Sequence, residues 1–289
     1  DYFRVDPAGN ITGFVIVDKC PDLEKRSEIS DYIMNKVDKS VEQVGFISKD
    51  ATGNLRMDMM GGEFCGNASR SFALYCADIM GINGIESLNV SVSGSKEKVE
   101  VSVDTIKRKS EIELSPAIKT EYLDFNEGRY FTVFLEGITH VIVNDKKPDR
   151  LTAKNLIAQI KNIYEEEAYG VMFLDEENFK MTPFVYVVAT DTLVPESSCG
   201  SGTVSCGYYF NRLSKENCLN LVKNSDKINR KSKCNTDVLQ TKNDFKITLE
   251  QPGGSLELIK IIRGEKVSYK IGGKVLFGEK QKINFYDNI

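Results

Sequence analysis

Two short segments of the chain carry the side chains best suited to chemistry. Each holds one cysteine, followed by glycine and small polar residues and then by an apolar run; they are Glu63–Ser69 (EFCGNAS) and Glu196–Thr203 (ESSCGSGT). This order is typical of a strand that turns into a capped helix. A helix N-terminus lowers a cysteine pKa from its usual value of about 8.5 and offers backbone N–H groups to an anion. We therefore expect Cys65 and Cys199 to be reactive thiols at helix N-termini.

Such a pair of thiols is suited to inverting an α-carbon. Inversion removes a proton from one face of the carbon and returns a proton to the other face, which a single base cannot readily do. If Cys65 and Cys199 flank a substrate, one thiolate takes a proton, the other thiol supplies one, and the helix N-termini hold the carboxylate. Because one thiolate disfavours a second beside it, we expect the resting pair to hold one thiol and one thiolate, in either arrangement.

The two cysteine turns, in this order and at this separation, resemble those of the diaminopimelate epimerase family of amino-acid racemases. Three weaker similarities support the resemblance: Ala8–Asn10 before an apolar strand, Glu42–Gln43 where the family has Asp-Gln, and Leu135–Val141 where the family has a strand with Gly-Asn-Pro-His. The resemblance implies an α+β fold of two pseudo-symmetric domains, each a β-sheet barrel wrapped around a central α-helix. It also implies an enzyme that works without a cofactor.

The resemblance also assigns the site. Cys65 and Cys199 are expected to alternate as base and acid, and the turns after them to hold the α-carboxylate. The residues expected at the substrate are Asn10, Gln43, Glu63, Gly66, Asn67, Glu196, Gly200 and Ser201. Of these, Glu63 and Glu196 are hypothesised to bind the α-ammonium or an imidazole N–H. The single histidine of the chain, His140, is expected mainly as a hydrogen-bonded residue of the core or its rim.

Departures from the family pattern concern the substrate. Members that act on diaminopimelate bind its distal groups with Glu-Arg-Gly and Asn-Ala-Asp-Gly segments, where this chain has Val187–Thr192 and Arg56–Gly62. A distal zwitterion would lose a bidentate arginine and several amides, and a site cannot easily hold a buried charge without such partners. The turns GGEFCGN and ESSCGSG instead resemble the histidine racemase branch. We expect conversion of L-histidine to D-histidine, with epimerisation of LL- to meso-diaminopimelate as the alternative.

Other classes of protein fit the sequence less well. A pyridoxal-phosphate racemase needs a Schiff-base lysine, to which nothing in the sequence points. An isomerase of the phenazine-synthesis type shares the two-half fold but has no cysteine pair. A thiol redox protein, or a non-catalytic binding protein of the same fold, stays open as a less favoured alternative.

Composition bounds the location and the partners. The 289 residues carry a net charge of −4, which gives no basic footprint for nucleic acid or for an acidic membrane surface. Seven cysteines, an odd number without a Cys-x-x-Cys or Cys/His cluster, favour a reduced cytoplasmic protein without a metal site. No signal peptide or membrane segment is visible. We therefore expect a cytoplasmic enzyme with a small-molecule amino-acid substrate, assembled as a homodimer.

Two halves with the same order of elements are expected. The first half covers residues 1–117 with Cys65, the second covers 118–276 with Cys199, and residues 277–289 return to the first. At about 150 residues per domain, the length agrees with two domains. Helical spacing predicts the helices Ile29–Val37, Ala68–Met80, Ala153–Tyr164 and Thr203–Leu213, and a solvated connection is expected at Lys223–Lys242.

Overall fold

The computed structural model describes residues 1–189, 191–223 and 246–283. The chain divides into two compact units, each of mixed α and β structure. Unit 1 comprises Asp1–Glu113, Gly253–Ser255 and Gly272–Ile289, and unit 2 comprises Leu114–Pro252 and Leu256–Ile271. The α+β class expected from the sequence is confirmed. The domain boundary at residue 117 stays a prediction.

Unit 1 is built on a mixed sheet. Its strands are β1 (Tyr2–Asp6), β2 (Thr12–Ile16), β3 (Gln43–Lys49), β4 (Leu55–Met59), β5 (Ile85–Val92), β6 (Val99–Asp104), β7 (Lys109–Leu114) and β17 (Leu276–Phe277). β1 runs antiparallel to β2, β2 parallel to β3, β3 antiparallel to β4, and β4 parallel to β5. The helices are α1 (Leu23–Tyr32), which continues as a π-helical turn over Ile33–Val37, and α2 (Gly66–Ile79).

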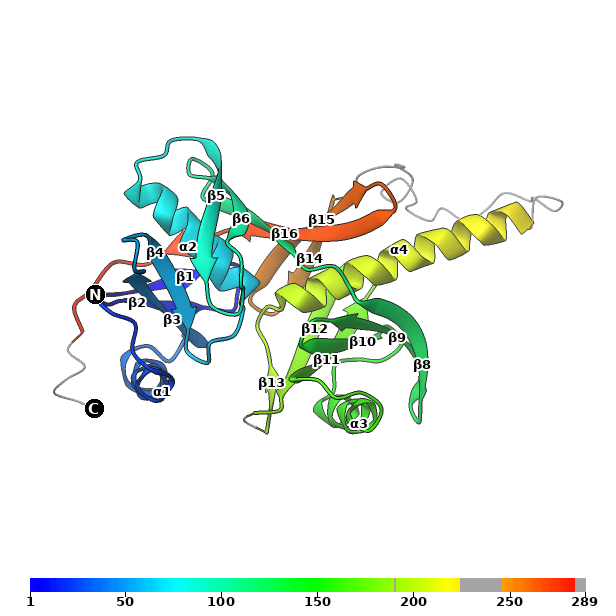
Figure 1. Cartoon of the computed structure of the whole chain (residues 1–289). Helices are drawn as coiled ribbons and strands as arrows, with labels where there is room; N and C mark the ends of the chain where they lie inside the picture. The colour runs from blue at the N-terminus through cyan, green and yellow to red at the C-terminus, as the bar shows by residue number, and fades with distance from the viewer. Residues whose placement is uncertain (190, 224–245, 284–289) are drawn as a thin grey trace. The chain divides into compact units, whose positions relative to one another are not determined.

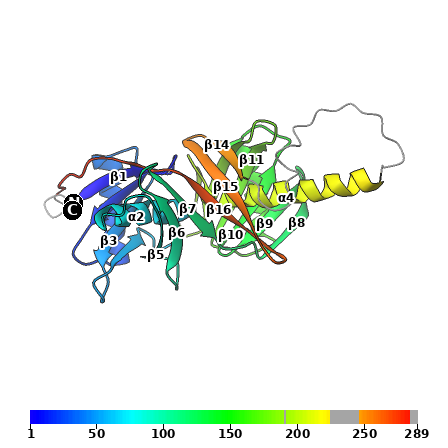
Figure 2. The same cartoon turned by 90° about the horizontal axis from the view of Figure 1, so that it is seen from above.

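Unit 2 contains most of the residues of the remaining strands and two further crossover connections. The strands are β8 (Lys119–Phe125), β9 (Gly128–Leu135), β10 (Ile138–Val143), β11 (Ala168–Asp175), β12 (Lys180–Val187), β13 (Thr192–Pro195), β14 (Lys246–Gln251), β15 (Gly254–Arg263) and β16 (Lys266–Lys274). The helices are α3 (Arg150–Lys161) and α4 (Gly200–Lys223). The first turns of α4 lie on the sheet, and its last turns extend beyond it (Figure 2).

The two units repeat one topology, which can be followed by the labels in Figure 1. The series β9, β10, β11, β12, β14 pairs in the same alternation of antiparallel and parallel contacts as the series β1 to β5. Parallel neighbours need a long crossover connection, and helices supply it: α1 and α3 for the first parallel pair, α2 and α4 for the second. A cysteine therefore precedes the second crossover helix of each unit.

The crossover helices differ in how deeply they are buried. In α2, every residue from Asn67 to Ala77 is buried, which explains the mostly apolar sequence of this helix. α3 is amphipathic instead: its buried residues recur at helical spacing from Ala153 to Ile160 and pack on Val141 and Val171 of the sheet. Burial on nearly all sides holds the N-terminus of α2 in a fixed place.

Two helix predictions were wrong at their ends. The first helix begins at Leu23 rather than Ile29, because Asp22 caps it by accepting the Lys25 N–H at 2.9 Å, while the exposed first turn shows no apolar spacing. The helix expected to end at Leu213 continues to Lys223, since the polar run Ser214–Asn217 interrupts the apolar pattern. The connection expected at Lys223–Lys242 lies, after its first residue, outside the described residues.

Arg70 of α2 is the largest fully buried side chain of the described chain, and it ties three segments of unit 1 together. Its guanidinium donates to Asn67 Oδ1 at 3.1 Å, to the Gly273 carbonyl at 3.1 Å and to the Pro7 carbonyl at 2.5 Å. The last of these bonds fixes the chain just before the turn that carries Asn10. Arg70 thus joins the start of α2 to the N-terminal turn and to β16.

Replacing Arg70 by methionine keeps the bulk of the side chain but leaves those acceptors buried without their donor. We expect the free energy of unfolding to fall by about 3–5 kcal/mol, measured by urea denaturation. Arg56→Met is the control: Arg56 pairs with Asp58 at 2.9 Å but is 37 % exposed, so its loss should cost less than about 1 kcal/mol. Equal losses in the two variants would contradict the structural role of Arg70.

Candidate active site

The Cys65 thiol caps α2 in place of the usual oxygen. After β4 the chain turns at Gly62 (φ 81°) and reaches Cys65 in an extended conformation. The Cys65 sulfur accepts the Ala68 N–H at 3.5 Å, and the Cys65 carbonyl accepts the Ser69 N–H at 2.9 Å. Helices α1 and α3 are capped by the carboxylates of Asp22 and Asp149. Because sulfur is a weak acceptor, a cysteine stabilises the helix less than an aspartate would at this position. Its presence here is therefore better explained by a chemical role than by helix stability.

A polar cluster surrounds the Cys65 sulfur. Gln43 Nε2 lies 3.2 Å from Cys65 Sγ, 2.6 Å from Asn10 Oδ1 and 2.8 Å from Thr12 Oγ1. The parallel register of β2 and β3 sets Thr12 opposite Gln43. A turn with positive φ at Ala8, Gly9 and Asn10 (φ 55° at Asn10) places the Asn10 side chain beside the Gln43 amide. The amide and the helix N-terminus both donate to the sulfur, and the thiol in turn donates to Asn10 Oδ1 at 3.7 Å, so the Cys65 sulfur is held by hydrogen bonds from both sides.

The turn before α4 repeats the Cys65 arrangement. Cys199 Sγ accepts the Gly202 N–H at 3.4 Å, and the Cys199 carbonyl accepts the Thr203 N–H at 3.0 Å. A Cβ at residue 202 would lie 2.3 Å from Met172 Sδ and 3.2 Å from the Cys199 sulfur, so only glycine allows this close approach. Both predicted cysteines therefore lie at helix N-termini with the same backbone geometry.

The surroundings of Cys199 favour the protonated thiol. Cys199 is only 5 % exposed. Burial raises the pKa of the Cys199 thiol well above its usual range, and the charge of Glu196, which also accepts a hydrogen bond from the thiol, raises it further. The Ser201 hydroxyl, 3.5 Å from the sulfur, acts in the opposite direction but more weakly. Cys199 is thus a buried thiol that holds its proton at neutral pH.

His140 is a core residue of β10 in direct contact with this turn. Its Nε2 lies 2.9 Å from Ser201 Oγ, while Nδ1 is buried and has no hydrogen-bond partner among the described residues. A Cβ at Gly170 would lie 2.1 Å from His140 Nδ1, so the imidazole packs directly on the backbone of the neighbouring strand. Desolvation lowers the pKa of His140 to about 3, and the ring is therefore neutral at physiological pH.

The remaining predicted residues are four at the helix starts and two glutamates. Gly66 and Asn67, like Gly200 and Ser201, are the first two residues of their helices, where the N–H groups have no acceptor within the helix. Glu196 touches the Cys199 thiol. The Glu63 side chain is exposed and has no recorded contact with Cys65; its backbone carbonyl accepts the Ser93 hydroxyl at 2.8 Å.

Sequence reasoning missed four residues of these two clusters, which are Thr12, Arg70, Thr203 and Gln251. Thr12 and Arg70 lie in segments that read as ordinary strand and helix. Gln251 had a usable signal, because a lone glutamine that ends a strand directly before Pro-Gly-Gly stands at a fixed corner of the chain.

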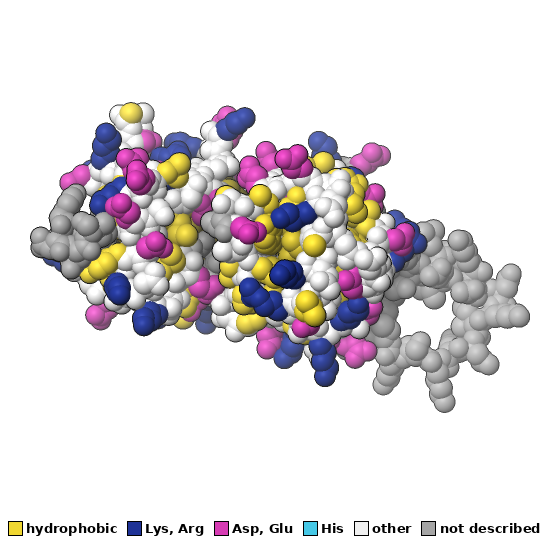
Figure 3. Space-filling model, turned by 90° about the horizontal axis from the view of Figure 1, so that it is seen from below, with side chains coloured by type: hydrophobic (Ala, Val, Ile, Leu, Met, Phe, Trp, Pro, Cys, Tyr) yellow, Lys and Arg dark blue, Asp and Glu magenta, His cyan; other side chains and the backbone are white. Residues whose placement is uncertain are grey.

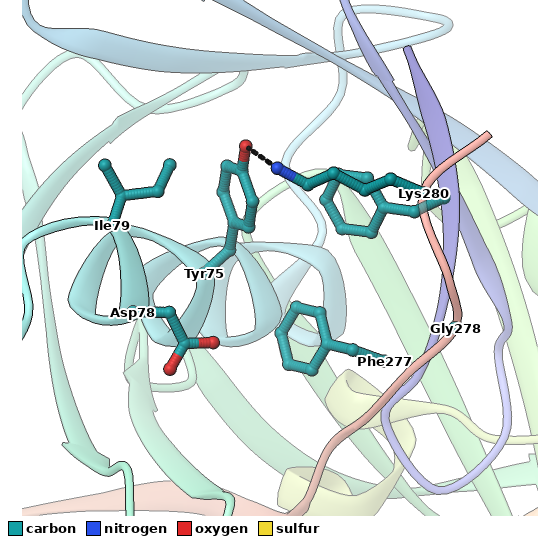
Figure 4. A pocket seen from close by; sticks show the side chains of 7 residues that line it. Tyr75, Asp78, Ile79, Phe277, Gly278 and Lys280 are labelled. Carbon is teal, nitrogen blue, oxygen red and sulfur yellow. Dashed lines mark hydrogen bonds between the residues drawn. The ribbon is translucent and has the colours of Figure 1, made fainter. Parts of the chain in front are cut away.

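A pocket of unit 1 lies away from the cysteine turns. It is lined by Phe3, Tyr75, Asp78, Ile79, Phe277, Gly278 and Lys280, most of which Figure 4 labels. The Lys280 ammonium donates to Tyr75 Oη at 3.2 Å, and Asp78 is paired with Arg108 at 2.6 Å. None of the predicted site residues lines this pocket, so we do not assign the chemistry to it.

On the face drawn in Figure 3, acidic and basic side chains are mixed over each unit. No three His, Cys, Asp or Glu side chains gather as a metal-ligand set within the described ranges. In the same part of the chain, no helix is both long and apolar enough to cross a membrane.

Comparison with known proteins identifies the class. The fold matches that of a probable proline racemase from Agrobacterium radiobacter K84 (TM-score 0.56, 12 % identity, 99 % of this chain and 94 % of that one). It also matches a putative phenazine biosynthesis PhzC/PhzF protein from Clostridium difficile (TM-score 0.58, 14 % identity, 98 % and 99 %). At these identities the likeness establishes the fold that racemases and phenazine-type isomerases share.

Sequence comparison identifies the family within the proteins that share this fold. The family model described as "Histidine racemase CntK N-terminal domain" matches residues 1–237. A histidine racemase from Fusobacterium nucleatum is 34 % identical over 221 residues, covering 73 % of this chain and 81 % of the relative. The protein is thus an isomerase of the racemase and epimerase class. More specifically, the chain belongs to the histidine racemase family, and the resemblance noted from the two cysteine turns is confirmed.

The neutral burial of His140 predicts a pH-dependent stability. Its folded pKa lies below the unfolded value of 6.5, so between about pH 6.5 and about pH 3 the unfolded chain binds a proton that the folded chain rejects. The free energy of unfolding should fall on acidification by up to about 1.4 kcal/mol per pH unit from this group. No further loss from His140 is expected below about pH 3, and none arises above pH 6.5.

Urea denaturation of the wild type and of His140→Gln across this pH range measures the effect. Because the chain has a single histidine, the difference in slope between the two proteins belongs to His140 alone. The wild type should lose more stability on acidification than the variant. Parallel pH profiles would contradict the neutral burial of the ring.

Proposed function

We propose that this protein is a cofactor-independent histidine racemase that uses Cys65 and Cys199 as its two acid–base groups. The observation that carries the proposal is the repeated cysteine-led helix start, with a half-buried thiol among amide side chains in one unit and a buried thiol beside a carboxylate in the other. Membership of the histidine racemase family supports histidine as the substrate and D-histidine as the product.

In the proposed reaction, the Cys65 thiolate takes the α-proton from one face of the substrate. The electron pair of the broken C–H bond stays on the α-carbon and is delocalised into the carboxylate. The Cys199 thiol then gives its proton to the opposite face, which leaves Cys65 as a thiol and Cys199 as a thiolate. The reverse reaction runs from that second state, so one site serves both enantiomers.

The substrate carboxylate is proposed to bind the N–H groups that begin the two helices. Gly66 and Asn67 supply those of α2, and Gly200 and Ser201 supply those of α4. Charge builds up on the carboxylate oxygens as the α-proton leaves, so these donors stabilise the transition state more than the bound substrate. Asn10 and Gln43 are proposed as further contacts to the substrate beside Cys65.

Glu63 and Glu196 are proposed to bind the α-ammonium or the imidazole N–H of histidine. The Glu63 side chain is exposed and lies two residues before Cys65. Glu196 already contacts the Cys199 thiol, so it has a second role in keeping that thiol protonated. A cation bound by Glu196 would lessen this effect, and the charge on the substrate would help to make Cys199 a usable acid.

The organisation around this site is also proposed. The two compact units would be the two domains of a diaminopimelate epimerase-like fold, each a β-sheet barrel around its cysteine-led helix. The protein is proposed to act in the cytoplasm as a homodimer, on a small amino acid. The net charge of −4 and the odd number of cysteines support a reduced compartment and a small-molecule substrate.

Proton NMR in deuterium oxide tests the function directly. With L-histidine and no added cofactor, the α-proton signal should disappear and D-histidine should form. LL-diaminopimelate in a parallel sample should show no exchange. Exchange with diaminopimelate alone would contradict histidine as the substrate, and exchange with neither would contradict the racemase.

The two-thiol mechanism is tested by single substitutions. Cys65→Ala and Cys199→Ala should each lower the racemisation rate by about 10³-fold or more, because each removes a proton donor or acceptor from the reaction. Cys76→Ala is the matched control, since burial raises the pKa of this α2 thiol to about 12 and the residue takes no part in the mechanism. Full activity of Cys199→Ala would rule out the two-base mechanism.

Glu196→Gln separates the two roles of that carboxylate. Removing the negative charge lowers the pKa of the Cys199 thiol, so the alkaline limb of the pH–rate profile should move to lower pH. If Glu196 also binds a cationic group of the substrate, the KM for histidine should rise. An unchanged profile together with an unchanged KM would show that Glu196 has neither role.

A further inference from the structure

We infer that Gln251 is a positioning residue for Cys199: its side-chain amide holds the backbone of the cysteine turn and thereby fixes the direction of the thiol. The inference rests on the proposed function in one respect, since it takes Cys199 as an acid–base group of the reaction. Its geometry lies wholly within unit 2.

Gln251, at the end of β14, forms a closed set of hydrogen bonds with the Cys199 turn. Its Oε1 accepts the Cys199 N–H at 2.7 Å, and its Nε2 donates to Thr203 Oγ1 at 2.9 Å. The Thr203 hydroxyl in turn donates to the Cys199 carbonyl at 2.7 Å. The amide thus controls both backbone polar groups of Cys199, the N–H directly and the carbonyl through Thr203.

Only an amide satisfies all of these bonds. The single hydrogen of the Thr203 hydroxyl goes to the Cys199 carbonyl, so the hydroxyl oxygen must accept from Gln251. The Cys199 N–H needs an acceptor at the same side chain. Glutamate would supply the acceptor without the donor, and methionine would supply neither. Gln251 is 5 % exposed, so water does not readily replace the lost partners.

The position of Gln251 is itself fixed by the strand. The preceding residue, Glu250, donates its N–H to the Phe179 carbonyl at 2.9 Å, and its side chain lies 3.2 Å from the Lys180 ammonium. Pro252 follows and restricts the backbone after the glutamine. The amide is therefore held by a rigid element, as a group that positions a catalytic turn must be.

This arrangement also limits which N–H groups face a substrate. Because the Cys199 N–H is already bonded to Gln251, only the N–H groups of Gly200 and Ser201 at this turn are left for a carboxylate. Loss of the Gln251 amide would release the Cys199 N–H and let the turn rotate. A displacement of the thiol by about 1 Å is enough to cost about 10²-fold in rate.

The test compares Gln251→Met and Gln251→Glu with the wild type in the full-length protein. For Gln251→Met we expect kcat to fall by about 10²-fold with KM changed far less, because the thiol is misplaced while most binding groups stay. Gln251→Glu keeps the acceptor for the Cys199 N–H and adds a charge beside the thiol. The alkaline limb of its pH–rate profile should therefore move to higher pH, and its kcat should fall less than that of the methionine variant.

A second measurement does not depend on racemase activity. Iodoacetamide alkylation, followed for each cysteine peptide by mass spectrometry, reports the accessibility and ionisation of Cys199, with Cys65 as the reference in the same molecule. Gln251→Met should change the Cys199 rate by at least about tenfold and its pH dependence with it, and should leave Cys65 unchanged. Equal changes at both cysteines would mean general loosening and would overturn the inference.

Gln159→Met is the matched control. Gln159 lies in the same unit and also clamps a backbone N–H, that of Asn126, through Oε1 at 2.8 Å, while its Nε2 donates to Glu127 at 2.6 Å. It has no recorded contact with the Cys199 turn. Its loss should lower the melting temperature without moving the kcat, the pH profile or the Cys199 alkylation rate. If Gln251→Met behaves in the same way, Gln251 is merely structural and the inference is wrong.

The two proposals fail in distinguishable ways. A wild type that exchanges no histidine α-proton would contradict the proposed function, but the alkylation comparison would still decide whether Gln251 positions Cys199. A wild-type racemase whose Gln251→Met variant keeps full kcat and an unchanged Cys199 alkylation profile would overturn the inference alone.

Discussion

The cysteine at the start of a buried helix is the constraint on which the rest of this structure depends. A cysteine sulfur at a helix N-cap accepts the helical N–H more weakly than a serine, threonine or aspartate oxygen would, so it stabilises the helix less. Each unit compensates by holding the turn from elsewhere. In unit 1, Gln43 and Asn10 surround the Cys65 sulfur, and Arg70 anchors the chain just before Asn10. In unit 2, Gln251 and Thr203 hold the Cys199 backbone.

The two turns share a pattern of backbone hydrogen bonds and differ in their side chains, and the separate roles proposed for the two cysteines rest on this difference. The Cys65 sulfur is partly exposed, receives an amide N–H from Gln43 and donates to Asn10 Oδ1. The Cys199 sulfur is buried, lies beside the Glu196 carboxylate and keeps its proton. The neutral His140 ring forms a hydrogen bond with the Ser201 hydroxyl and adds no charge to the turn. The repeated fold thus places two thiols in unlike surroundings, which is the basis of the proposed roles of base and acid.

Much of the fold and of the candidate site could be predicted from the sequence, and the parts that could not be predicted have physical reasons. The cysteine turns and α2 were predictable because small polar residues before an apolar run are a local signal. The start of α1 was missed because its first turn is exposed, and the end of α4 because the polar run Ser214–Asn217 interrupts its apolar pattern. Gln251 contacts Cys199, and Thr12 contacts Gln43 beside Cys65, through pairing and burial that connect residues distant in sequence. The Pro-Gly-Gly that follows Gln251 marks a corner of the chain, but a local pattern does not report which residue the glutamine contacts.

The measurement that tests the central claim most directly is carbon-13 NMR of the protein with labelled cysteine Cβ atoms, titrated through the neutral and alkaline range. Substitution of single cysteines by serine assigns the signals. The account predicts that Cys65 becomes a thiolate at a lower pH than Cys199, and that Cys199 keeps its proton throughout the neutral range. Titration of both thiols at the same pH, or of Cys199 first, would contradict the account.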